Sequence, residues 1–119
     1  PVDILIPASV TDVINDDNKD DIKARIIVEG ANIPMTEKIE KELFNKGILI
    51  VPDLIANAGG VISSFAEYRS YNPKRMFWLV KRKITASVSL VLKRSLKLNQ
   101  NPRDVALEIA KQRVRAGSS

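Results

Sequence analysis

Three short apolar runs at equal spacing constrain the fold of this sequence more than any other feature. They begin at residues 4, 26 and 48, a constant spacing of 22 residues, and cover residues 4–6, 26–28 and 48–51. Each run is continuous and rich in Ile and Val, which is typical of strands buried on both faces of a parallel sheet. The intervals are long enough for the crossover connections that parallel strands need. We therefore predict an α/β fold with about three parallel strands.

The two intervals between these runs differ in how clearly they predict helices. In the second, Thr36 is a good N-cap, Glu37 suits the positive end of a helix, and Gly47 is a natural residue just after a helix end. The apolar face of this helix would consist of Ile39, Leu43 and Phe44. The first interval supports only turns, over residues 11–14 and 20–24. The pattern is β-α-β-α-β, a partial doubly wound, Rossmann-like parallel sheet.

The rest of the chain predicts helices. One should run from about residue 54 to the break at Asn72-Pro73, followed by a long helix over residues 74–97. The apolar stripe of the long helix would consist of Phe77, Val80, Ile84, Val88 and Val91. Asn101 with Pro102 favours the start of a last helix, whose apolar side would be Leu107, Ala110 and Val114. Met76 and Trp78 are interpreted as packing residues. We place a boundary between a sheet unit, residues 1–71, and a carboxyl-terminal helical segment, residues 72–119.

Small and amide residues follow all three predicted strands. The exits read Pro7-Ala8-Ser9, Glu29-Gly30-Ala31-Asn32, and Pro52-Asp53 leading to Asn57-Ala58-Gly59-Gly60. In an open α/β sheet, ligands bind beyond the carboxyl ends of the strands. A glycine inside a helix costs about 1 kcal/mol relative to alanine, so two adjacent glycines need a reason. They would let a flat ligand approach the backbone and the N–H groups of a first turn, or they would allow a tight helix–strand packing contact with Asn57 as a cap.

Composition excludes several classes of chemistry. The sequence has neither cysteine nor histidine, which rules out disulfides, thiolate catalysis, the Ser-His-Asp triad and the usual zinc ligands. We expect no catalytic and no metal-ligating residue in this chain, no membrane span, and a cytoplasmic location. The net charge is +5, and no acidic residue occurs between Glu67 and Asp104. Such a basic block suits a nucleic-acid surface, but a solvated helix face or a face for an acidic neighbour is the favoured interpretation.

Taken together, three blocks of the sequence resemble a known enzyme family. They are residues 28–32, VEGAN; residues 47–53, GILIVPD; and residues 57–61, NAGGV. With their spacing, they are similar to the carboxyl-terminal part of the glutamate/leucine/phenylalanine/valine dehydrogenases, and the resemblance covers nearly the whole chain. It implies that residues 1–71 are the second half of a dinucleotide-binding domain. It also implies an enzyme that converts an amino acid to its 2-oxo acid and ammonia with NAD or NADP.

The resemblance also implies roles for six residues. Ala8 and Ser9 would lie near the dinucleotide, Asn32 near the ribose next to the nicotinamide, and Asn57 at the nicotinamide. Val61 and Ser64 would line the pocket for the substrate side chain. Serine at the last position resembles the glutamate enzymes, in which the hydroxyl meets the distal carboxylate. A buried hydroxyl facing only an apolar side chain would lack a partner, so L-glutamate and 2-oxoglutarate are the expected substrate pair.

The parts of the family pattern that this sequence lacks shape the remaining expectations. The catalytic lysines and aspartate of the family lie in an amino-terminal domain, and its G-x-G-x-x-G phosphate-binding turn lies at the first strand; neither is present here. We therefore expect a segment that is inactive alone, with an incomplete cofactor site. A homo-oligomer is the expected assembly, and the open edge of the first strand should favour self-association. The alternatives are a non-catalytic, subunit-like relative and a basic nucleic-acid-binding module.

Overall fold

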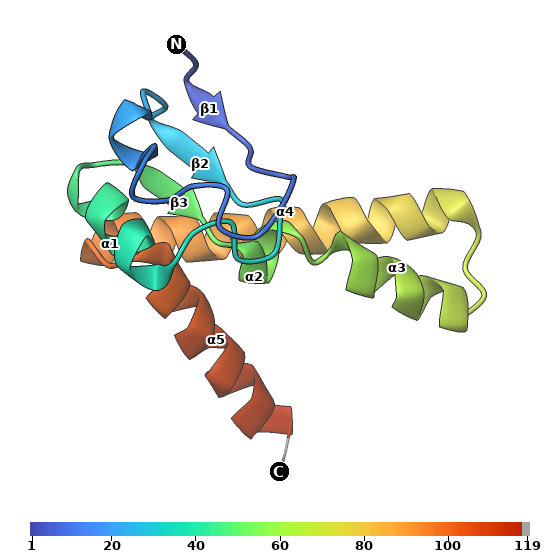
Figure 1. Ribbon diagram of the computed structural model, residues 1–119. Coiled ribbons are helices and arrows are strands. Elements are labelled where there is room, and N and C mark those ends of the chain that lie inside the picture. Colours follow the sequence, from blue (N-terminus) through green and yellow to red (C-terminus); the bar gives the residue numbers. More distant parts are fainter. Residues whose placement is uncertain (118–119) are drawn as a thin grey trace.

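In the computed structural model, which describes residues 1–117, the three apolar runs pair as one parallel sheet (Figure 1). The strands are β1 (Ile4–Leu5), β2 (Ile26–Val28) and β3 (Leu49–Val51), in the spatial order β1-β2-β3. The register aligns Ile4 with Ile26, and Ile27 with Ile50. The predicted three-stranded, Rossmann-like α/β fold is confirmed. The end of the predicted helical segment, residues 118–119, lies outside the described residues.

Helix α1 (Glu37–Asn45) forms as the sequence predicts. The Thr36 hydroxyl accepts a hydrogen bond from the Ile39 N–H at 3.4 Å, and Gly47 adopts a φ of 92° after the last turn. Its apolar face packs on the sheet and completes a core in which the buried residues are Ile14, Ile27, Met35, Ile39, Leu43 and Ile50. This core fixes the loops that follow β2 and β3.

The first crossover contains one 3-10 turn, η1 (Lys19–Asp21), in place of a helix. Its Asn and Asp side chains bond the local backbone: Asn18 Oδ1 accepts from the Asn15 N–H at 2.9 Å, and Asn15 Oδ1 accepts from the Asp17 N–H at 3.0 Å. Such bonds compete with helical ones, so this stretch folds as consecutive turns.

After β3, the predicted single helix is divided in two. Helix α2 (Asp53–Ala56) is followed by Asn57 as its C-cap, and α3 (Gly59–Tyr68) begins two residues after Asn57. The expectation of one helix from residue 54 is therefore wrong, because Asn57 leaves helical geometry with a φ of −103° and a ψ of 14°. As a result, the two glycines lie in the first turn of α3, where backbone N–H groups lack helical acceptors.

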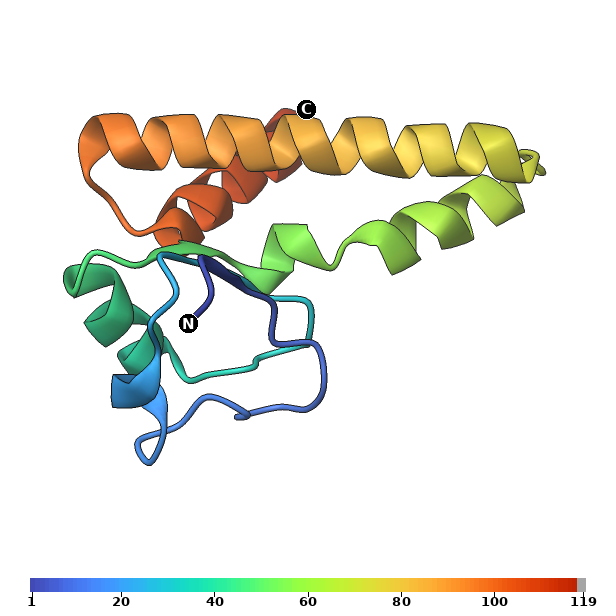
Figure 2. The same ribbon diagram turned by 90° about the horizontal axis from the view of Figure 1, so that it is seen from above.

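Helix α4 (Pro73–Leu98) is capped by Asn72, whose Oδ1 accepts from the Arg75 N–H at 2.9 Å. It runs antiparallel to α3, and the two helices form an arm that projects from the sheet in both views (Figures 1 and 2). Val91 of the predicted stripe is buried, whereas Phe77 is 66% exposed and Trp78 is 57% exposed. The packing role predicted for Trp78 is wrong, and so is the place of Phe77 in the buried stripe, because both lie near the start of α4, on the projecting arm. Met76, the other predicted packing residue, is half-buried.

Helix α5 (Pro102–Gly117) turns back at an oblique angle to α4 (Figure 1) and packs on it and on β3. Its buried residues are Pro102, Val105, Ala106 and Ile109. The predicted apolar side is wrong for Leu107 and Val114, which are exposed, whereas Ala110 is half-buried. Within residues 1–117, none of the helices combines the length and apolar character that crossing a bilayer requires.

Candidate functional site

The loops after β2 and β3 meet through two of the residues singled out from the sequence. Asn57 Nδ2 donates a hydrogen bond to Asn32 Oδ1 at 2.6 Å. Asn32 is exposed and Asn57 half-buried, at the edge of the sheet where the strands end. The bond uses one of the two side-chain N–H groups of Asn57 and the side-chain oxygen of Asn32. The Asn32 amide group and the Asn57 carbonyl oxygen therefore stay available as a donor and an acceptor for a ligand.

The loop after β1 joins the same edge. The Ala31 N–H donates to the Pro7 carbonyl at 2.8 Å, and a Cβ placed on Gly30 would lie 3.2 Å from the Cβ of Ala8. Ala8 therefore adjoins the loop that carries Asn32. Ser9 follows it on the surface and is exposed.

Val61 and Ser64 lie on α3, where it leaves the sheet edge to form the arm (Figure 2). Val61 is 77% exposed and Ser64 is also exposed. The Ser64 hydroxyl donates to the Gly60 carbonyl at 3.0 Å, and the neighbouring Ser63 hydroxyl donates to the same oxygen at 2.8 Å. The structure thus brings Ala8, Asn32 and Asn57 together and places Val61 and Ser64 farther along the chain on one exposed helix.

The two glycines face different surroundings. A Cβ on Gly59 would lie 3.6 Å from Val80 and 3.7 Å from Ile84, so this residue faces α4 at ordinary contact distance. A Cβ on Gly60 would meet no atom within 4 Å. A tight packing contact therefore does not explain Gly60, over which the described part of the chain leaves space for the approach of a ligand.

Behind this edge lies a buried cluster of charges that was not predicted from the sequence. Arg103, in the first turn of α5, lies between three carboxylates. Its Nε donates to Glu40 Oε2 at 2.8 Å, its Nη2 donates to Asp53 Oδ1 at 2.9 Å, and the same nitrogen lies 3.5 Å from Glu29 Oε1. Glu29 is 0% exposed, and within residues 1–117 neither of its side-chain oxygens has a hydrogen-bond partner. Glu29 directly follows β2, and Asp53 lies two residues after the end of β3. That placement of charge next to apolar runs is the only sequence signal for this cluster.

The cluster shifts the pKa values of its members in opposite directions. Burial and the nearby Glu40 carboxylate raise the pKa of Glu29 to about 8, so Glu29 is mostly protonated at neutral pH. Burial opposes ionisation of Asp53, but hydrogen bonds from the Ile33 N–H and from Arg103 outweigh it and lower the pKa of Asp53. Burial opposes the charge of Arg103, but its interactions with Glu40 and Asp53 outweigh this effect and raise its pKa. At neutral pH the cluster therefore holds an ionised Asp53, the Arg103 guanidinium and a mostly protonated Glu29.

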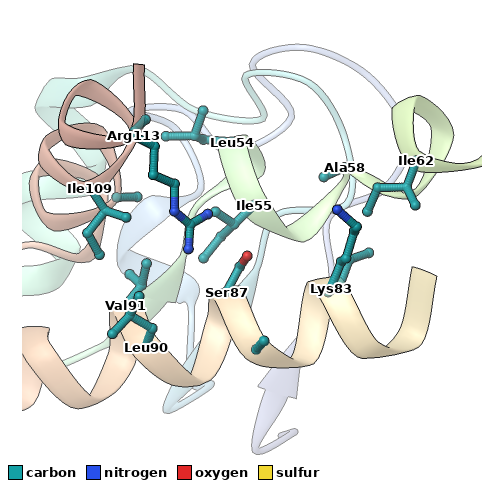
Figure 3. A pocket seen from close by; sticks show the side chains of 14 residues that line it. Leu54, Ile55, Ala58, Ile62, Lys83, Ser87, Leu90, Val91, Ile109 and Arg113 are labelled. Carbon is teal, nitrogen blue, oxygen red and sulfur yellow. The ribbon is translucent and has the colours of Figure 1, made fainter. Parts of the chain in front are cut away.

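A cavity of about 640 Å³ opens between α2, α4 and α5 (Figure 3). None of the six residues proposed from the sequence lines it. The cations of the basic block do not form one uniform surface either. The Arg75 guanidinium lies 3.7 Å from the centre of the Tyr71 ring, and that of Arg82 lies 5.2 Å from the Trp78 ring. These two guanidinium groups are engaged within the arm.

Comparison with known proteins identifies the family. The model of the glutamate/leucine/phenylalanine/valine dehydrogenases matches residues 1–117. The chain belongs to this family. It is 43% identical, over an alignment of 126 positions, to a glutamate dehydrogenase of Aeropyrum pernix, covering 96% of this chain and 30% of that enzyme. An NADP-specific glutamate dehydrogenase of Saccharolobus shibatae is 50% identical over 56% of this chain and 16% of its own length. An NAD-specific glutamate dehydrogenase of Staphylococcus aureus is 49% identical over 59% of this chain and 17% of its own length.

Solved structures of two dehydrogenases share the fold. L-tryptophan dehydrogenase from Nostoc punctiforme superimposes with a TM-score of 0.87 at 26% identity, covering 98% of this chain and 35% of that one. Hetero-hexameric glutamate dehydrogenase from Thermus thermophilus, in its Leu-bound form, superimposes with a TM-score of 0.78 at 25% identity. The match covers 93% of this chain and 28% of that one. The chain thus spans about a third or less of the length of these relatives.

Proposed function

We propose that this chain is the carboxyl-terminal segment of an NAD(P)-dependent glutamate dehydrogenase, which oxidises L-glutamate to 2-oxoglutarate and ammonia. The contact between Asn32 and Asn57 carries the proposal, because it joins two strand exits into one polar pair at the edge where such sheets bind ligands. The chain would contribute residues and no catalytic group, so it is expected to be inactive alone. A cytoplasmic homo-oligomer is the proposed setting.

The residues present fit the nicotinamide half of a dinucleotide. Asn32 and Asn57 keep a free donor and a free acceptor, which a carboxamide and a ribose require, and the surface over Gly60 is open. Ala8 and Ser9 would flank the same cofactor. Bound NAD or NADP would supply the hydride acceptor. NAD-specific and NADP-specific relatives match at similar identity, which supports the idea that the preference is read elsewhere in the whole enzyme.

Glutamate is the proposed substrate because of Ser64. The structural neighbour from Nostoc is a tryptophan dehydrogenase, so the shared fold leaves the substrate open. A hydroxyl at Ser64, next to the exposed Val61, would donate to the distal carboxylate of glutamate. In the free chain this hydroxyl is directed to the Gly60 carbonyl and would turn from it on binding.

A chimaera tests this proposal. Residues 1–117 would replace the matching segment of the Aeropyrum pernix glutamate dehydrogenase, and deamination of glutamate and of norvaline, which lacks the distal carboxylate, would be measured. Ser64→Ala should lower kcat/KM for glutamate about tenfold or more, the effect of losing a hydrogen bond to a charged group, and should hardly affect norvaline. Ser63→Ala is the matched control, since Ser63 bonds the same carbonyl. Equal losses with both substrates, or a chimaera without activity, would contradict the proposal.

Two alternatives are tested separately. A non-catalytic relative would bind a complete dehydrogenase subunit yet give an inactive chimaera. A nucleic-acid-binding module would show a steep dependence of log affinity for DNA on log salt concentration.

A further inference from the structure

The cavity between α2, α4 and α5 has the size and walls of a small-molecule site. Its volume of about 640 Å³ falls within the range of roughly 300–1,000 Å³ that is usual for such sites. Ile55 of α2, Val91 of α4 and Ile109 of α5 contribute apolar walls from three directions, as Figure 3 shows. Four alanines also line it, at positions 58, 86, 106 and 110, and their small side chains leave the space open.

Two cations enter this apolar space without a counter-ion. Lys83 from α4 and Arg113 from α5 direct their side chains into the cavity (Figure 3). No Asp or Glu is among the lining residues, and within residues 1–117 neither cation lies within 4.0 Å of a carboxylate. Both side chains are also exposed, so the mouth of the cavity is accessible.

A hydroxyl lies beside these cations. Ser87 is one helical turn after Lys83, and its oxygen points into the cavity (Figure 3). In the described part of the chain this hydroxyl makes no hydrogen bond that would commit it elsewhere, in contrast to Ser63, Ser64 and Ser95. A guanidinium, an ammonium and a free hydroxyl donor thus face one apolar cavity.

We propose that this cavity binds a small carboxylate that carries an apolar chain and no ammonium group. The Arg113 guanidinium suits a carboxylate because it offers two parallel N–H donors, and Ser87 adds a third. The chain of the ligand would replace water against Ile55, Val91 and Ile109. An amino acid is disfavoured, because its ammonium would enter a space with two cations and no acidic side chain. The site lies on the side of α2 and α3 that faces α4, and it does not depend on the proposed dehydrogenase function.

The test uses the 119-residue chain with ¹³C-labelled alanine methyl groups and octanoate as the probe. Octanoate should shift the methyl signals of the four cavity alanines and leave those of Ala24 and Ala31, in the sheet unit, unchanged. Octan-1-ol has the same chain without the charge, and 2-aminooctanoate has the same chain and carboxylate with an added ammonium. Both should bind at least tenfold more weakly than octanoate.

Variants separate recognition by charge from simple apolar binding. Arg113→Gln should weaken octanoate binding about tenfold or more, as expected for loss of a charged hydrogen bond. Arg115→Gln, on the same helix but outside the lining, should not change it. Lys83→Gln should also weaken binding, with Lys81→Gln as its control. Equal binding of octanoate and octan-1-ol would overturn the proposal, and so would an unchanged affinity in Arg113→Gln. It would also be overturned by cavity signals that shift with protein concentration alone, because these would indicate a second copy of the chain as the occupant.

Discussion

Protonation of Glu29 should make the stability of this chain depend on pH in an unusual direction. The carboxyl group faces Glu40 from α1, Arg103 from α5 and Asp53 from α2, and it is completely buried. Its pKa rises from 4.5 to about 8 on folding. Between these values the folded state holds more protons than the unfolded state. The free energy of unfolding should therefore fall as pH rises through this window, by roughly 1 kcal/mol per pH unit.

Glu29→Gln replaces the protonated acid by a neutral group of the same shape. The variant should be as stable as the original chain near pH 5 and more stable by a few kcal/mol near pH 8, because its amide cannot ionise. Urea unfolding followed by circular dichroism, at half-unit steps from pH 5 to pH 8.5, measures this difference. The control is Glu67→Gln, at an exposed residue, which should keep the slope of the original chain.

Parallel pH profiles for Glu29→Gln and the original chain would refute the reasoning, because they would show that Glu29 ionises in the folded state as easily as in the unfolded one. A rise of stability between pH 5 and pH 8 would refute it as well. Asp53 does not confuse the measurement. Its lowered pKa gives a stabilising contribution that is present above pH 4 and is lost only as pH falls further.

Three further predictions follow from single contacts. Arg103→Ala leaves buried carboxylates without their cation and should lower the free energy of unfolding by about 3–5 kcal/mol, whereas exposed Arg115→Ala should change it by less than about 0.5 kcal/mol in the same denaturation experiment. Gly47→Ala should cost about 1 kcal/mol because the φ of 92° strains an L-residue, while Gly60→Ala, in a helical turn with free space, should stabilise by up to about 1 kcal/mol, both measured by thermal unfolding. Thr36→Ala should cost about 1 kcal/mol through loss of the α1 cap, and Thr36→Ser should restore it.

The sheet could be predicted from the sequence because continuous β-branched runs are typical of parallel strands. The expected burial on both faces is wrong for the first run, since Ile4 is 52% exposed and Ile6 59% exposed at the edge of the sheet. The capped helix α1 was equally predictable, because its signals at Thr36 and Gly47 are local. Helix α5 was placed correctly along the chain but on the wrong face. It carries two apolar stripes, one through Val105 and Ile109 and the other through Leu107 and Val114, and periodicity does not choose between them. The choice depends on contacts with α4.

The charged cluster could not be predicted, because its bonds join residues far apart in sequence. Arg103 is 63 residues from Glu40 and 50 from Asp53. Nothing local marks it as the partner of either, among ten lysines and arginines between Glu67 and Asp104. The pair of Asn32 and Asn57 was more accessible, because the carboxyl ends of neighbouring parallel strands must share one edge.

The buried cluster and the polar pair are parts of one connected arrangement. Asp53 Oδ1 accepts a hydrogen bond from Arg103. Its other carboxylate oxygen, Oδ2, accepts one at 2.8 Å from the N–H of Ile33, which directly follows Asn32. Asp53 also begins α2, and the Asn57 N–H at the end of this helix donates to the Asp53 carbonyl at 3.1 Å. One aspartate thus holds both loops that present the asparagines, and Arg103 holds the aspartate. The last helix therefore contributes to the candidate site through position alone, since a shift of its first turn would move both asparagine loops without touching a ligand.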